Sequence, residues 1–125
     1  MATVTNANKK QETVAIDAAG LSIGRVATAA AKALMGKTFP AYTPNIASIV
    51  HVNVSNAAKM HLPLKKREGK TYTHYTGHPG GLKIESLQTL LQRRGHEAAI
   101  RKAVERMLPR NTLRTGRLKR LSITD

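Results

Sequence analysis

The sequence predicts an α/β domain in which short strands alternate with helices along the chain. The stretch IVHVNV at residues 49–54 is β-branched and apolar, as a central strand is. Apolar residues recur at helical spacing on both sides of that stretch. The chain has 125 residues, 41% of them hydrophobic, which fits one domain and leaves little room for a second.

The first half of the chain predicts a strand, a helix and a second strand. Residues 1–11 are polar, so we expect a flexible N-terminal segment before a single domain over residues 12–125. ETVAIDA at 12–18 is the first expected strand. Ser22 is the expected N-cap of the helix and Gly36 its C-terminal stop. The apolar face of this helix consists of Ile23, Val26, Ala27, Ala30 and Leu34.

The second half predicts two more strands and two helices. KKREGK at 65–70 has the composition of a basic turn, and KTYTHYT at 70–76 alternates as a third strand does. Two helices are expected next, and Pro109 should end the second of them. LKRLSIT at 118–124 is the fourth expected strand. The helices are marked by Ile84, Leu87 and Leu91, and by Ile100, Ala103, Val104 and Met107.

Charge is the strongest functional signal. The chain carries 21 Lys and Arg against 7 Asp and Glu, a net charge of +14. So basic a surface favours a polyanionic partner, with nucleic acid ahead of an anionic membrane. No apolar run is long enough to span a bilayer, and MATVTNANKKQ lacks the apolar core of a secretory signal. The absence of Cys excludes disulfides and Cys-ligated zinc.

The histidines and glycines of YTHYTGHPGGLK, residues 72–83, raise the possibility of a catalytic loop. His74 and His78 lie four residues apart, but Gly77, Pro79 and the following glycines disfavour a helix that would bring them together. The nearest acids are Glu68 and Glu85. The glycine spacing matches neither of the phosphate-binding motifs GxGxxG and GxxxxGK(S/T). No serine lies in the GxSxG motif of a nucleophile elbow. We therefore expect no catalytic residue, metal, cofactor or small-molecule substrate.

Two basic clusters favour nucleic acid instead. One lies in residues 65–70, and the other follows Pro109 without an intervening acid. If residues 111–118 are helical, Arg110, Arg114 and Arg117 share an outward face while leucines anchor this basic C-terminal arm. Only four aromatic residues are present, too few for a platform that stacks bases. Backbone and shape recognition of folded RNA fits this composition better.

Four ordered motifs resemble the large ribosomal subunit protein L-thirteen family. They are DAAGLSIGRVA, GKTFPAYTP, YTHYTGHPGGLK and MLPRN, within a resemblance that extends from about Val14 to Ile123. Asn56, Ala57 and Lys59 also resemble a family segment. Four features depart from the pattern. Ala47 and Val50 stand where acids are usual, and Leu113-Arg114-Thr115 stands where Leu-Gly-Arg is expected. Tyr75 takes the place of a usual histidine, and the usual tail rich in His, Ala, Gln and Pro does not follow the last strand.

The resemblance implies a three-layer α/β domain around a small, mainly parallel sheet, here of four strands. It also implies a non-enzymatic constituent of the large subunit that binds large-subunit ribosomal RNA beside neighbouring ribosomal proteins and supports early assembly, in the cytoplasm or an organelle. The alternatives are a translational regulator acting off the ribosome and a small His-dependent phosphoryl-transfer enzyme. The expected RNA-binding residues are Arg25, Lys37, Lys65, Lys66, Arg67, Lys70, His74, Tyr75, Gly77, His78, Gly80, Gly81, Lys83, Arg110, Asn111, Arg114, Arg117, Lys119 and Arg120.

Overall fold

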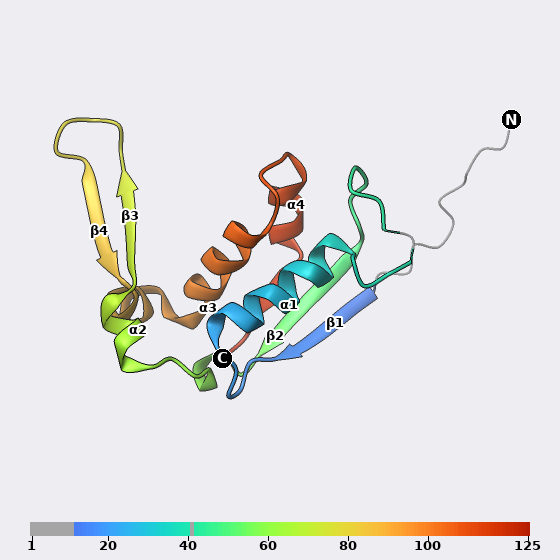
Figure 1. The fold of residues 1–125 in the computed structure, drawn as a ribbon, viewed down its shortest axis with the longest axis horizontal. Coiled ribbons are helices and arrows are strands. Elements are labelled where there is room, and N and C mark those ends of the chain that lie inside the picture. The colour runs from blue at the N-terminus through green and yellow to red at the C-terminus, as the bar shows by residue number, and fades with distance from the viewer. Residues whose placement is uncertain (1–11, 41) are drawn as a thin grey trace, which may run out of the picture.

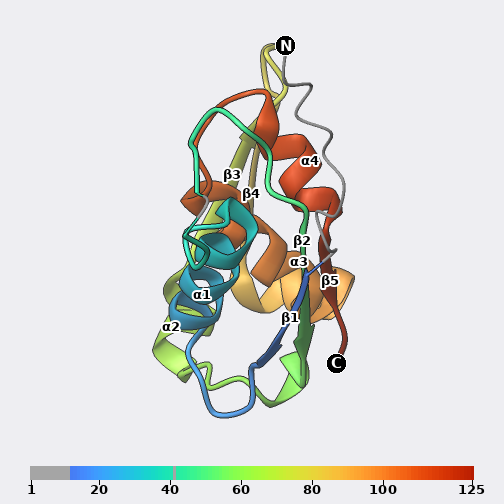
Figure 2. The ribbon, with the colours of Figure 1, turned by 90° about the vertical axis from the view of Figure 1, so that its right-hand side faces the viewer.

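A parallel three-stranded sheet forms one side of the molecule (Figures 1 and 2). The computed structural model describes residues 12–40 and 42–125, so the expected flexible segment lies outside the described residues. The sheet contains β1 (Glu12–Asp17), β2 (Val50–Ser55) and β5 (Leu121–Ile123), in the order β1-β2-β5. Both strand pairs are parallel. The predicted α/β class with a small parallel sheet is therefore confirmed.

One face of this sheet forms part of the core. Val52 is the buried centre of the middle strand and lies beside Val14 on one side and Leu121 on the other. On the opposite face, Ala15, Asn53 and Ser122 are all exposed. Among the described residues, no helix covers this face, where a three-layer domain would have one.

Helix α1 (Ile23–Met35) covers the buried face of the sheet and also packs against the long helix α3 (Figure 2). The predicted apolar face of α1 is buried along its whole length. Gly36 ends the helix in the left-handed conformation, as predicted, with φ of 80°. Ser22 occupies the N-cap position, although its side chain makes no capping hydrogen bond. The many alanines of α1 allow α3 to approach closely.

The basic stretch expected to be a turn is helical. A short 3-10 helix, η1 (Ala57–Lys59), leads to α2 (Leu64–Gly69), which begins after Pro63. The Pro63 carbonyl accepts hydrogen bonds from the backbone amides of Lys66 and Arg67. Proline is favourable beside a helix N-terminus, because the first amides of a helix have no internal partner. This local signal outweighs the turn composition of KKREGK.

The third predicted strand does not join the parallel sheet. Strands β3 (Thr71–Tyr75) and β4 (Leu82–Ser86) pair with each other as an antiparallel hairpin that projects beyond the helices (Figure 1). The prediction of a helix around Ile84 is wrong, because residues 82–86 form a strand that pairs with β3. The parallel sheet consequently has three strands rather than four.

Helix α3 (Leu87–Met107) begins directly after the hairpin. The Ser86 hydroxyl accepts a hydrogen bond from the Thr89 amide at 3.2 Å, as an N-cap does. Gly95, with φ of 78° and ψ of −177°, divides α3 into two helical segments. The helix ends at Met107, just before Pro109, as predicted. Helix α4 (Leu113–Lys119) then packs against α1, α3 and β5, so the expected C-terminal arm belongs to the body of the domain.

Candidate nucleic-acid interface

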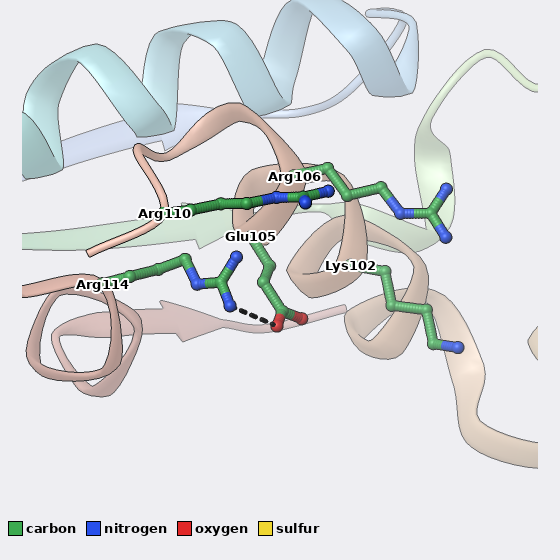
Figure 3. Close-up of a pocket in the computed structure, with 5 residues that line it drawn as sticks. All are labelled: Lys102, Glu105, Arg106, Arg110 and Arg114. Carbon is green, nitrogen blue, oxygen red and sulfur yellow. Dashed lines mark ion pairs between the residues drawn. The ribbon is translucent and has the colours of Figure 1, made fainter. Parts of the chain in front are cut away.

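A shallow cationic hollow lies between the end of α3 and the start of α4. It has a volume of about 370 Å³ and is lined by four cations and one acid. Figure 3 shows Lys102 and Arg106 extending from α3, and Arg110 and Arg114 extending from the segment that follows it. The carboxylate of Glu105 lies among them, 3.9 Å from the guanidinium of Arg114.

A second hollow, of about 350 Å³, lies where the hairpin meets α3. Lys102 lines both hollows, so they are adjacent and form one surface. We call the cations of this surface the basic track: Lys83, Arg93, Arg94, Lys102, Arg106, Arg110 and Arg114. The second hollow is lined by Tyr72, Thr73, His74, Lys83, Glu85, Arg93, Arg94 and Lys102.

Tyr72 organises the centre of this surface. Lys102 Nζ lies 4.8 Å from the centroid of the tyrosine ring, Lys70 Nζ lies 5.5 Å away and the Arg106 guanidinium 5.6 Å away. Tyr72 is 8% exposed, and its burial raises the pKa of its hydroxyl while the Arg106 charge opposes that rise. The aromatic face attracts the cations and stays neutral at physiological pH. A neutral ring can therefore position three positive charges without cancelling them.

Both acids of the surface are paired. Arg93 donates two hydrogen bonds to the Glu85 carboxylate, each of 2.8 Å. These bonds hold the pKa of Glu85 below its usual range and raise the pKa of Arg93. Glu105 faces Arg114. Because seven cations accompany these two carboxylates, the surface keeps a clear positive excess.

The hairpin places some predicted residues on this surface and others elsewhere. His74 and Lys83 face each other across the strands and line the second hollow. Tyr75, the next residue, belongs to the opposite face of the hairpin. His78 lies in the turn at the hairpin tip, together with Gly77, Gly80 and Gly81.

Glycines shape the hairpin turn in two ways. Gly77 and Gly80 adopt φ of 85° and 76°, which favour glycine over other residues. Gly81 lies so close to the Thr76 side chain that a Cβ at this position would clash with it. These glycines thus shape the turn that connects β3 to β4.

The other predicted residues lie outside the two hollows. Arg25 and Lys37 are exposed at opposite ends of α1. Lys70 lies next to the track through its contact with Tyr72. The Asn111 side chain accepts a hydrogen bond from the Leu113 amide at 3.1 Å, so it supports the start of α4. The remainder are on α2 or at the end of α4: Lys65, Lys66, Arg67, Lys119 and Arg120.

Arg117 does not lie on an outward face with Arg110 and Arg114, and that expectation is wrong. Helix α4 begins at Leu113, so Arg110 precedes it and the helical spacing does not extend to that residue. Arg117 is 2% exposed, and its Nε has no hydrogen-bond partner among the described residues. Arg120 is half-buried beside it, and burial together with the Arg117 charge lowers the pKa of Arg120.

Sequence reasoning missed four cations of the basic track: Arg93, Arg94, Lys102 and Arg106. One signal was available, because Lys102, Arg106 and Arg110 recur at intervals of four residues. Arg93 and Arg94 carried no such signal. Their place in the track depends on the hairpin, which the sequence did not predict.

Part of the first motif has a structural role. The Asp17 carboxylate accepts hydrogen bonds from the Ala19 amide at 3.0 Å and from the Asn56 side chain at 2.9 Å. These bonds lower the pKa of Asp17. They connect the ends of β1 and β2, while Gly20 turns the chain toward α1 with φ of 73°. Asp17 and Gly20 therefore shape the domain away from the basic track.

The surface concentrates positive charge around two open hollows. Residues 12–40 and 42–125 contain no group of three or more potential metal-ligating His, Cys, Asp or Glu side chains. None of the helices in those residues is long and apolar enough to cross a membrane. The fold and surface define a basic α/β protein with an open cationic track.

The chain belongs to a family of ribosomal proteins. The profile described as Ribosomal protein L13 matches residues 11–124, nearly the whole chain. The resemblance found in the four motifs is thereby confirmed. The family consists of structural components of the large subunit, which supports the expectation of a non-enzymatic protein over a phosphoryl-transfer enzyme.

Curated relatives agree with this assignment. The large ribosomal subunit protein uL13 of Rhodopseudomonas palustris (strain BisB18) is 45% identical over 106 residues, covering 85% of this chain and 68% of the relative. The protein of that name in Methylorubrum extorquens (strain PA1) is 48% identical over 100 residues, covering 80% and 65%. The one in Moorella thermoacetica is 44% identical over 108 residues, covering 86% and 74%. The matches thus span about two thirds of the length of the first two relatives.

Proposed function

We propose that this chain binds large-subunit ribosomal RNA through the basic track and supports early assembly of the large subunit. The observation that carries the proposal is the continuity of the two cationic hollows through Lys102. A continuous row of cations can follow a phosphate backbone, whereas scattered charges cannot. The family assignment supports large-subunit ribosomal RNA as the class of RNA.

Recognition rests on the backbone and shape of the RNA. The aromatic ring in the track, that of Tyr72, is buried beneath its cations and is not free to stack on a base. The arginines can each donate two parallel hydrogen bonds to a phosphate, and Lys102 adds a point charge. The two hollows are shallow and open, which suits the irregular phosphate positions of a folded RNA.

The proposed function implies a location in the cell. A component of the large subunit is expected in ribosomes, in the cytoplasm or inside an organelle, beside neighbouring large-subunit proteins. A regulator of translation acting off the ribosome would use the same cationic surface. The two functions differ in where the protein is found, and sedimentation separates them.

The test is co-sedimentation of tagged protein with large subunits in a sucrose gradient. The tagged wild-type chain should migrate with the large subunit and with its early precursors. Binding to deproteinised large-subunit RNA should weaken steeply between about 50 and 200 mM salt, since neutralised phosphates release counterions. A chain found only in light fractions, or a flat salt response, would contradict the proposal.

A further inference from the structure

The hairpin of β3 and β4 has two chemically different faces. Residues that are directly opposite in an antiparallel pair lie on the same face, and neighbours along a strand alternate. Tyr72 and His74 therefore share one face with Glu85 and Lys83, the face that lines the second hollow. The other face carries Thr71, Tyr75, Leu82, Ile84 and Ser86, together with Thr73, which also lines the edge of the second hollow.

This second face is apolar and open. Tyr75 is 61% exposed, Leu82 is 59% exposed and Ile84 is 65% exposed. Tyr75 lies directly opposite Leu82, and Ile84 follows two residues later on the same side of β4. The three side chains are close neighbours, which we call the apolar hairpin patch.

The patch carries no charge in a chain whose net charge is +14. Phosphates gain little from such a surface, and the cations of the hairpin lie on its other side. A second copy of the chain is disfavoured, since two bodies of the same large positive charge repel each other. Charge therefore favours an uncharged apolar surface on a different protein.

The shape of the hairpin supports the same conclusion. An isolated two-stranded ribbon is marginally stable in water, and further strands or packing on a face are needed to hold it. The body of the protein supports the base of one face, where Tyr72 is buried. The hairpin projects beyond the helices (Figure 1), and Tyr75, Leu82 and Ile84 on its second face stay exposed.

We propose that the apolar hairpin patch docks on an uncharged, apolar surface of a neighbouring large-subunit protein, while the other face of the hairpin contacts RNA. This inference rests on the proposed function. Three side chains make a small contact, well under the roughly 800 Å² per partner of a stable interface. The contact consequently forms in the assembled subunit, where RNA holds both proteins close and raises their effective concentration.

Site-specific photo-crosslinking in purified large subunits tests the two faces separately. Lys83 and Ile84 are adjacent in sequence but lie on opposite faces, so they form a matched pair. We expect Ile84→p-benzoylphenylalanine to give an adduct with one large-subunit protein that survives nuclease, with the crosslink in an apolar segment identified by mass spectrometry. Lys83→p-benzoylphenylalanine should give an adduct that nuclease removes.

The outcomes distinguish the inference from the function on which it rests. An adduct from position 84 to RNA or to a second copy of the chain, or no adduct, overturns the docking proposal. If position 83 still crosslinks to RNA, the proposed function stands. If neither position crosslinks to RNA and the protein is absent from large subunits, the proposed function fails as well.

A second variant measures what the patch contributes. Replacing Tyr75, Leu82 and Ile84 with threonine removes the apolar surface and keeps a residue that favours strands. Affinity for deproteinised RNA should change by less than about twofold, while retention in salt-washed large subunits should fall about tenfold, the loss expected of a modest interface anchor. Unchanged retention would show that the patch is not a docking surface.

Discussion

Removing two of the three cations that lie over Tyr72 should weaken RNA binding far more than removing two other positive charges. The test variant is Lys102→Gln with Arg106→Gln, which takes charge from the junction of the two hollows. The control is Lys32→Gln with Lys59→Gln, two exposed lysines that line neither hollow. Both variants lose two charges, so nonspecific attraction is matched.

The magnitude follows from the number of phosphate contacts. If each lost charged hydrogen bond is worth about 1 kcal/mol net, two contacts cost about 2 kcal/mol, or roughly 30-fold in affinity. The logarithmic salt slope should shrink by about 1.4–1.8 units, because each released counterion contributes 0.7–0.9. The control variant should lose about threefold or less, since exposed charges away from the contact act only through a screened field.

The assay is a filter-binding or anisotropy titration against deproteinised large-subunit RNA at several salt concentrations. Circular dichroism must show that both variants are folded, since Lys102 and Arg106 each contribute about 0.5–1 kcal/mol through the Tyr72 ring. Equal losses in test and control would refute the track, because binding would then depend on total charge and not on position.

Three further predictions concern residues outside that pair. Gly81→Ala should disorder the hairpin turn and weaken retention in large subunits, because its Cβ would clash with Thr76. Gly69→Ala on helix α2 has open space for its Cβ and should be neutral. Comparable retention of the two variants would refute this prediction. Arg117→Met removes a buried guanidinium with an unpartnered Nε. The free energy of unfolding, measured by urea titration, should therefore stay unchanged or rise by about 1–4 kcal/mol. A marked loss of stability would show that Arg117 has a stabilising partner. Because the folded pKa of Glu85 is depressed, its stabilisation is present above the unfolded pKa and is lost as pH falls through the folded value. The stability difference between wild type and Arg93→Gln should therefore shrink below about pH 4, and a difference independent of pH would contradict the pairing.

The sequence by itself identified the elements whose signals are local. The apolar face of α1 and its stop at Gly36 follow from helical periodicity and from the tolerance of glycine for positive φ. Strand β2 follows from its β-branched residues, and the end of α3 follows from Pro109. The family followed from four motifs in order, and the polyanionic partner from charge that needs no fold to be counted.

Two local signals were misread. KKREGK has turn composition, but a helix beginning after Pro63 includes most of it. Residues 82–86 contain too few apolar positions to distinguish a strand from the first turn of a helix. Pairing with β3 decides between the two, and such pairing is a contact between separate segments.

Only the tertiary structure decided which cations form the basic track and which arginines are buried. Lys83 comes from the hairpin, Lys102 from α3 and Arg114 from α4, and only packing brings them to one surface. Arg114 and Arg117 belong to the same basic stretch after Pro109, yet Arg117 is buried because α4 packs against α1, α3 and β5. Net charge is a sum over residues and is fixed by composition, whereas the position of each charge depends on which helix face the core requires.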